Sequence, residues 1–210
     1  MLSNYTNTVN EIGVNEIGVN EIGIDEAGRG PLIGRVYAGA VIWPINLESN
    51  LIKDSKKLTK NKRKKAFDWI KDNIPLWAVG YAEHYEIDEL NILEATKLAM
   101  QRALDNLNVN VNNYTLIIDG YGWYKKFPDY KVHSIVNGDD KFYSIASASI
   151  IAKEYHDNYI KDLCKDNPDL DTKYDLLNNM GYGTKKHMTG ITNYGISNYH
   201  RKSFRPCKII

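Results

Sequence analysis

The stretch EIGIDEAGRGPLIGRVYAGAVIWP, residues 21–44, predicts two β-strands separated by a glycine-rich turn. The first strand, residues 21–25, ends before Gly28 and Gly30, and the second, residues 36–43, is stopped by Pro44. A sheet with two neighbouring strands at the start of the domain is the expectation that follows.

The first strand is also the third copy of a five-residue repeat, NEIGV-NEIGV-NEIGI, residues 10–24. The two β-branched residues of a copy share one face of a strand, but a shift of five residues moves them to the other face. One copy can therefore form a strand, whereas three in line form a poor one. We expect residues 1–19 to be a disordered arm and residues 20–210 to be a single domain.

Apolar periodicity predicts further strands and helices along the rest of the chain. The expected strands are residues 76–83, 114–119 and 130–136, and the expected helices are residues 59–70, 87–107 and 142–163. Small side chains at residues 146–149 would let the last of these helices approach a sheet closely. Residues 174–195 indicate two short helices around the loop 181–183. This order predicts an α/β fold with a mixed sheet and a helical C-terminal third.

The composition is that of an ordinary globular protein, with 210 residues, 43 % hydrophobic and 25 % charged. No apolar run approaches the roughly 18 residues of a membrane span, and the N-terminus lacks the order of a signal peptide. Cys164 and Cys207 form no metal-type pair, so free thiols in a reducing compartment are expected. We therefore expect a cytoplasmic protein without membrane contact.

The net charge of only +1 means that a nucleic-acid function needs a local basic patch. One run, residues 53–65, holds eight Lys or Arg in thirteen positions. A second basic region near the end of the chain contains Lys185, Lys186, Arg201, Lys202 and Arg205. Each run is compatible with phosphate binding and equally with a solvated face.

Four carboxylates stand at strand ends or next to glycine. Asp25 and Glu26 precede the glycine turn, Asp119 ends an apolar strand before Gly120, and Asp139 follows another strand. The ends of strands in an α/β sheet are where sites are built. The alternatives are a surface acidic pair at the first position and a helix cap at Asp139.

No dinucleotide fingerprint, P-loop or zinc motif competes with these carboxylates. A site with oxygen ligands alone favours a hard cation, Mg²⁺ or Mn²⁺. Two such ions about 4 Å apart are suited to hydrolysis of a phosphodiester.

Several collinear motifs resemble the ribonuclease HII family, also called the type 2 ribonucleases H. They are GIDEAGRGPLIGRVYAGAVI (23–42), DSKKLT (54–59), IIDG (117–120), GDDKFYSIASASIIAKEYHD (138–157) and GYGTKKHMTGITNYGISNYHRKSF (181–204). They span the chain from about Glu21 to Phe204, and DEAGRGP after a strand is highly specific.

The resemblance implies a ribonuclease-H-like fold, a central five-stranded mixed sheet flanked by helices, with a helical C-terminal extension. It implies an endonuclease that cleaves the RNA strand of RNA/DNA hybrids and incises duplex DNA at single ribonucleotides. We expect a monomer whose partners are RNA/DNA hybrids and duplex DNA that contains ribonucleotides. The implied metal-binding and catalytic residues are Asp25, Glu26, Asp119 and Asp139, and the implied substrate-binding residues are Gly28, Arg29, Gly30, Ser55, Lys56 and Tyr182.

The implied substrate roles agree with the chemistry of these residue types. Glycines 28 and 30 let the backbone approach a ribose 2′-hydroxyl, the group that separates RNA from DNA. Tyr182 would stack on the sugar at the RNA-to-DNA junction. Ser55 and Lys56 would hold phosphates at the start of the basic run.

Asn137 departs from the family pattern, and Asp157 belongs to it. The family more often has a basic residue where Asn137 stands. Asn137 lacks the charge with which a basic residue would contact a phosphate or a carboxylate. Asp157 lies in a family motif, and we interpret it as a structural partner.

A resolvase or integrase of the same fold would lack the GRG and GYGT elements, and a binding protein without catalysis would not need all four carboxylates.

Overall fold

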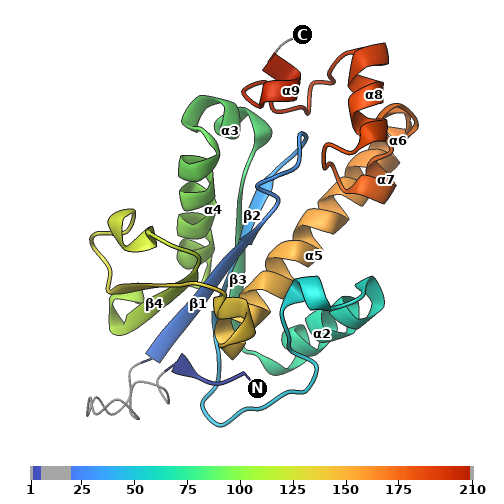
Figure 1. Ribbon diagram of the computed structural model, residues 1–210. Helices are drawn as coiled ribbons and strands as arrows, with labels where there is room; N and C mark the ends of the chain where they lie inside the picture. Colours follow the sequence, from blue (N-terminus) through green and yellow to red (C-terminus); the bar gives the residue numbers. More distant parts are fainter. Residues whose placement is uncertain (1, 6–19, 209–210) are drawn as a thin grey trace.

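One mixed sheet of five strands forms the centre of the computed structural model, which describes residues 2–5 and 20–208 (Figure 1). The spatial order is β3-β2-β1-β4-β5. β1 pairs antiparallel with β2 and parallel with β4, β2 pairs antiparallel with β3, and β4 pairs parallel with β5. The strands are β1 (Asn20–Ala27), β2 (Val36–Ile42), β3 (Leu76–Ala82), β4 (Tyr114–Asp119) and β5 (Val132–Ile135). The predicted five-stranded mixed sheet is confirmed.

Helices cover both faces of the sheet. α3 (His84–Leu90) and α4 (Ile92–Asn106) lie on one face, and α2 (Lys60–Asn73) and α5 (Tyr143–Asp166) lie on the other (Figure 1). The C-terminal extension gathers at one end of the molecule and contains α6 (Pro168–Tyr174), α7 (Leu176–Asn179), α8 (Lys185–Tyr194) and α9 (Arg205–Lys208). Four 3₁₀ turns complete the described elements: η1 (Ser55–Lys57), η2 (Val111–Asn113), η3 (Trp123–Lys125) and η4 (Gly138–Asp140).

α5 lies unusually close to the sheet because both surfaces lack bulk. A Cβ atom on Gly39 would lie 2.4 Å from the carbonyl oxygen of Ala148, and one on Gly23 would lie 2.3 Å from the carbonyl carbon of Ser144. The prediction that small residues in α5 permit a close approach is confirmed. The alternation of β1 places Ile22 and Ile24 in the core under α4 and Asp25 on the opposite side, toward α5.

The helix predicted over residues 87–107 is divided in two. Asn91 has a φ of 73° between α3 and α4, and its side chain accepts hydrogen bonds from the N–H groups of Leu93 and Glu94. Asn tolerates this left-handed conformation and is a favoured N-cap, so one residue both ends α3 and starts α4. Apolar periodicity alone continues across such a break.

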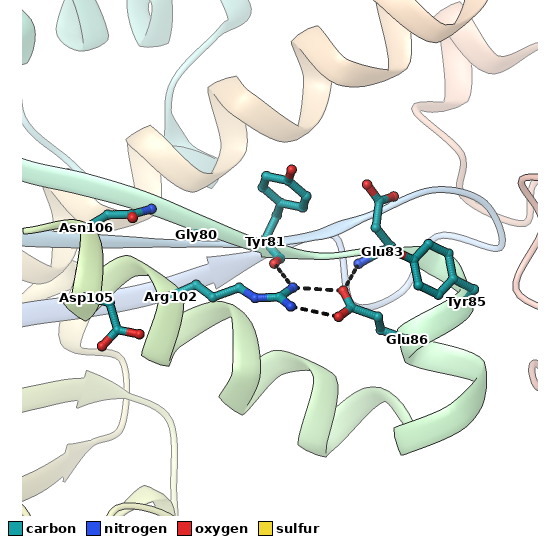
Figure 2. A pocket seen from close by; sticks show the side chains of 8 residues that line it. All are labelled: Gly80, Tyr81, Glu83, Tyr85, Glu86, Arg102, Asp105 and Asn106. Carbon is teal, nitrogen blue, oxygen red and sulfur yellow. Dashed lines mark hydrogen bonds and ion pairs between the residues drawn. The ribbon is translucent and has the colours of Figure 1, made fainter.

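The free edge of β3 is closed by side chains of α4. Arg102 donates to the carbonyl oxygen of Tyr81 at 2.8 Å and forms two hydrogen bonds with the Glu86 carboxylate (Figure 2). Asn106 donates to the carbonyl oxygen of Val79 at 2.9 Å. These bonds occupy acceptors that an edge strand would otherwise offer to another chain.

The predicted arm is described only at residues 2–5, and these residues contact the domain. Ser3 pairs in a parallel bridge with Phe142 just before α5, and the ring of Tyr5 lies edge-on to that of Phe142. Residues 6–19, which include the first two copies of the repeat, lie outside the described residues, so the boundary of the arm stays a prediction.

Among the described helices, none combines the length and the apolar character that crossing a membrane would need.

Candidate active site

A cleft of about 440 Å³ opens at the carboxyl ends of β1 and β4. Every residue predicted for the site lines this cleft except Asp139. Its walls include Asp25, Glu26, Gly28, Arg29, Gly30, Ser55, Lys56, Asp119 and Tyr182. Segments that are far apart in the sequence therefore meet at one edge of the sheet.

Three carboxylates converge at this edge. Asp25 comes from β1, Asp119 is the last residue of β4, and Asp139 belongs to η4, directly before α5. One ligand oxygen from each lies within 4.8 Å of the others, which is a spacing that one or more cations can bridge.

Burial and repulsion from neighbouring carboxylates disfavour the charged forms of Asp25 and Asp139. Burial raises the pKa of Asp25 well above its usual range, and the charges of Glu26 and Asp119 raise it further. Burial and the charge of Asp119 also raise the pKa of Asp139, against the opposing effect of Lys56. The Lys56 Nζ atom lies 3.3 Å from an Asp139 oxygen, and its own side chain remains largely exposed. One lysine leaves much of this negative charge unbalanced, so the donor set fits a divalent cation.

Glu26 does not join the three converging acids. Glu26 follows Asp25 on β1, which continues through Ala27, so its side chain leaves the strand on the other face, and Glu26 is not a member of the group whose oxygens lie within 4.8 Å of one another. Its carboxylate pairs with Arg29 at 3.1 Å, although it still lines the cleft and feels the charge of Asp119. The expected four-carboxylate set is thus brought together at three members, with the fourth beside them.

Asp139 does not cap α5. The N-cap of α5 is Phe142, which offers no side-chain hydrogen bond, and the first helical N–H, that of Tyr143, donates to the Ser3 carbonyl oxygen. The capping alternative for Asp139 is therefore not supported. Asp119 binds the turn η4 that carries Asp139, because the Asp119 Oδ1 atom accepts a 2.7 Å hydrogen bond from the Gly138 N–H.

The glycine turn is tightly enclosed. Gly28 has a φ of 90°, and a Cβ atom there would lie 2.5 Å from the buried ring of His156. A Cβ atom on Gly30 would lie 3.0 Å from the ring of Tyr182, so that ring rests directly against the turn. Tyr182 remains 42 % exposed.

Arg201 holds the turn from beneath. Its guanidinium is fully buried and donates to five backbone carbonyl oxygens at 2.6–3.0 Å, those of Gly28, Arg29, Pro31, Gly34 and Arg35. Burial lowers the pKa of Arg201 to about 10. The expectation that Arg201 belongs to an exposed basic region is wrong, because its five donors are all used inside the protein.

The basic run is also partly internal. Arg63 is buried and pairs with Glu154 at 2.6 Å and with Asp157 at 2.7 Å. Asp157 also contacts Lys153, which agrees with its interpretation as a structural partner. The Ser55 hydroxyl is buried against that of Ser149 at 2.9 Å, so it faces α5.

Some residues of the cleft were missed by sequence reasoning. Arg63, Ser149 and Lys153 line it. Ser149 and Lys153 lie in the stretch 138–157 that resembles the family, and Arg63 stands four residues after the stretch 54–59. Asn137 has a φ of 53°, a left-handed conformation that Asn adopts more readily than most residues. This backbone requirement gives a local reason for an Asn at a position where the family more often has a basic residue.

Comparison with known proteins bears on this geometry. The family model described as ribonuclease HII matches residues 22–207. The chain belongs to the ribonuclease HII family. It is 48 % identical over 181 residues to ribonuclease HII of Rickettsia akari, covering 86 % of this chain and 89 % of that one. It is 45 % identical over 182 residues to ribonuclease HII of Pelagibacter ubique, covering 85 % and 92 %. The family assignment makes the protein an endoribonuclease of the ribonuclease H type, a hydrolase that acts on RNA/DNA substrates.

Solved structures confirm the ribonuclease-H-like fold of this chain. Ribonuclease H2 from Pyrococcus horikoshii superposes with a TM-score of 0.71 at 26 % identity, over 91 % of this chain and 96 % of that one. A ribonuclease HIII, Bst-RNase HIII in complex with Mn²⁺, gives a TM-score of 0.71 at 20 % identity, over 90 % and 68 %. The second likeness supports the ribonuclease-H-like fold alone.

Proposed function

We propose that this member of the ribonuclease HII family cleaves the RNA strand of RNA/DNA hybrids and also incises duplex DNA at single ribonucleotides, leaving 5′-phosphate and 3′-hydroxyl ends. The observation that carries the proposal is that three converging carboxylates, two of which line the cleft, lie beside a glycine turn and an exposed tyrosine ring. The carboxylates suit phosphodiester hydrolysis, and the other two elements suit recognition of a sugar.

Asp25, Asp119 and Asp139 would hold the metal, with Glu26 as a fourth ligand from the edge of the cleft. Two divalent ions, Mg²⁺ or Mn²⁺, would supply an activated water and stabilise the leaving oxygen. Oxygen ligands alone favour these ions, and the relative described as a complex with Mn²⁺ has the same fold. Ionised Asp25 and Asp139 are required, so bound cations must offset the burial that raises their pKa values.

The glycine turn would recognise the ribose 2′-hydroxyl through backbone groups. Arg201 binds the carbonyl oxygens of Gly28 and Arg29, and a planar trans peptide directs its N–H opposite to its C=O. The N–H groups of Arg29 and Gly30 therefore point away from Arg201, where they can donate to a hydroxyl. A DNA sugar lacks that acceptor.

Tyr182 would rest on the neighbouring sugar at the RNA-to-DNA junction. Its ring lies against Gly30, so a sugar next to the recognised ribose would meet it directly. A neighbouring deoxyribose leaves room for this contact, whereas a further 2′-hydroxyl would crowd the ring. This arrangement would favour an isolated ribonucleotide or the last one before DNA.

Lys56 and the exposed lysines that follow it would bind phosphates without reading sequence. Lys56 would also lower the repulsion among the acids, since its Nζ atom already lies beside Asp139. Arg63 stays with its internal partners.

Incubation with duplex DNA that carries one ribonucleotide tests the proposal directly. In Mg²⁺ or Mn²⁺ we expect one cut next to the ribonucleotide and none in an all-DNA control of the same sequence. Excess chelator should abolish the cut. Full activity in chelator, or a cyclic phosphate product, would exclude the metal-dependent hydrolysis proposed here.

A further inference from the structure

Two buried histidines outside the cleft form a direct contact. His187 in α8 and His200 in the segment after it are both fully buried, and their Nε2 atoms lie 3.0 Å apart. The chemistry proposed above uses neither of them. Their outer nitrogens connect Ser197 to Tyr182.

The bonding partners fix the direction of every hydrogen bond in this chain. The Ser197 N–H lies 2.9 Å from His200 Nδ1, and a backbone N–H can only donate, so Nδ1 accepts. In a neutral imidazole the hydrogen is then on Nε2, which donates to His187 Nε2. His187 therefore carries its hydrogen on Nδ1, 3.1 Å from the Tyr182 carbonyl oxygen, which can only accept. Both ends of the chain independently demand the same direction.

The surroundings keep both rings neutral. Burial lowers the pKa of His187, and burial together with the nearby His187 lowers the pKa of His200 to about 4. The Tyr174 ring packs against both histidines, at centroid distances of 5.5 Å and 4.8 Å. The charge of a protonated His84, in α3, would lower the pKa of His200 further. A second proton on either ring would place two donors against each other.

The segment that contains His200 also contacts the glycine turn. His200 forms an antiparallel bridge with Ile33, and the neighbouring Arg201 binds the carbonyl oxygens of the turn. Leu32 donates its N–H to Gly181, the residue before Tyr182. Residues 200 and 201 thus fix the turn on one side and, through His187, the backbone of Tyr182 on the other.

We propose that His187 and His200 are positioning residues that hold Tyr182 against the glycine turn and thereby set the preference for an RNA-to-DNA junction. The proposal rests on the function proposed above for Tyr182. The His200–His187–Tyr182 chain of hydrogen bonds fixes the position of the Tyr182 ring, while the carboxylates determine the rate of cleavage at any RNA position.

The test compares two substrates on the same enzyme preparation. One is duplex DNA with a single ribonucleotide, and the other is a long RNA/DNA hybrid. The ratio of their kcat/KM values does not depend on the fraction of folded molecules, so lost stability alone leaves it unchanged. We expect Tyr182→Ala to lower the ratio by about tenfold, in the range for one lost stacking contact.

His187→Phe and His200→Phe, which keep a ring of similar size but no hydrogen bonds, should each lower the ratio at least about threefold. His187→Asn can present an amide N–H near the place of Nδ1–H and should recover most of the ratio lost in His187→Phe. In the Tyr182→Ala background the histidine variants should have no further effect on the ratio, because they act through that ring. Leu170→Ala, in the same C-terminal core, is the control for destabilisation and should leave the ratio unchanged.

The outcomes separate the two proposals. Equal losses on both substrates for Tyr182→Ala would overturn the junction role of Tyr182 itself. A selective loss for Tyr182→Ala together with an unchanged ratio in His187→Phe and His200→Phe would overturn the positioning role. If either phenylalanine variant fails to fold, the same histidine is replaced by Leu, which also lacks hydrogen bonds, and the same criterion applies: an unchanged ratio would overturn the positioning role.

Discussion

Asp139 is the residue whose role is most sharply tested by one substitution. Asp139→Asn keeps the shape of the side chain and loses the charge that would hold a cation beside Asp25 and Asp119. We expect turnover to be abolished while the Kd for a hybrid stays within about tenfold of wild type, because binding rests mostly on phosphate contacts. The matched control is Asp140→Asn, which removes a surface pair with Lys57. Near-normal turnover of Asp139→Asn would show that this acid is not a ligand.

Asp25 predicts a dependence of stability on pH and on metal. Its pKa is raised in the folded protein, so the folded state holds the proton more tightly than the unfolded state. Without metal, stability is therefore lowest above the raised pKa and increases as pH falls through it. Divalent ions bind the ionised acids, so the gain in Tm that they give should shrink over the same fall in pH.

Asp25→Asn should remove both effects. The amide oxygen can still accept the 2.7 Å bond from the Glu26 N–H, while the buried charge is gone. In chelator at neutral pH we expect a Tm above that of wild type, by about 2–4 °C for each kcal/mol of repulsion removed. Thermal melts with chelator, Mg²⁺ and Mn²⁺ at several pH values measure this, with exposed Asp129→Asn as control. A variant that melts below wild type in chelator would mean that the Asp25 charge is balanced within the protein.

At the scale of elements, the start of α5 is held by residues 2–5, the first described segment of the chain. Phe142 gives this helix no side-chain cap, and the Ser3 carbonyl oxygen accepts from the Tyr143 N–H at 3.1 Å. The Ser3 N–H in turn donates to the Lys141 carbonyl oxygen at 2.9 Å. The start of α5 directly follows the turn that carries Asp139, so residues 2–5 brace one wall of the site.

Ser3→Pro should loosen this contact by removing the N–H donor. Loss of one such bond is worth about 1 kcal/mol, which corresponds to a Tm lower by about 2–4 °C in a domain of this size. Ser3→Ala keeps the backbone bonds and loses only a long contact from the hydroxyl, so it is the matched control. If both variants melt with wild type, the segment does not stabilise α5.

The elements themselves were largely predictable, because period 2 and period 3.6 are local patterns. The close approach of α5, predicted from its small residues, is confirmed. Thr59, the first residue of the predicted helix 59–70, is the N-cap of α2. The division of the long helix at Asn91 was missed, since a left-handed Asn leaves the apolar pattern intact. The roles of Arg63 and Arg201 were missed for another reason: their partners lie 91 and up to 173 residues away in the sequence. A run of charges does not reveal which members fold inward.

For the whole molecule, the distribution of charge matters more than its sum of +1. Three carboxylates converge at the carboxyl ends of β1 and β4, and Arg63 and Arg201 bind partners inside the protein. Lys56 of the run 53–65 lines the cleft, and the side chains of Lys53, Lys57, Lys60, Lys62, Lys64 and Lys65 in the same run are exposed. A polyanionic duplex would contact these lysines while its scissile phosphate approaches the acids. The attraction between the lysines and the duplex would offset the repulsion between the phosphate and the acids.

Replacing Lys60, Lys62 and Lys65 together by Ala tests this distribution. All three side chains are exposed on the first turns of α2. We expect weaker hybrid binding at low salt and a shallower plot of log Kd against log salt, by up to about 0.9 for each lysine that contacts a phosphate. The rate of cutting at saturating substrate should stay near wild type, because none of the three lines the cleft. The control variant replaces Lys161, Lys165 and Lys208, which also takes the net charge from +1 to −2. Equal changes in slope for the two triple variants would mean that total charge, and not the basic run, governs binding; an unchanged slope in both would place the phosphate contacts elsewhere.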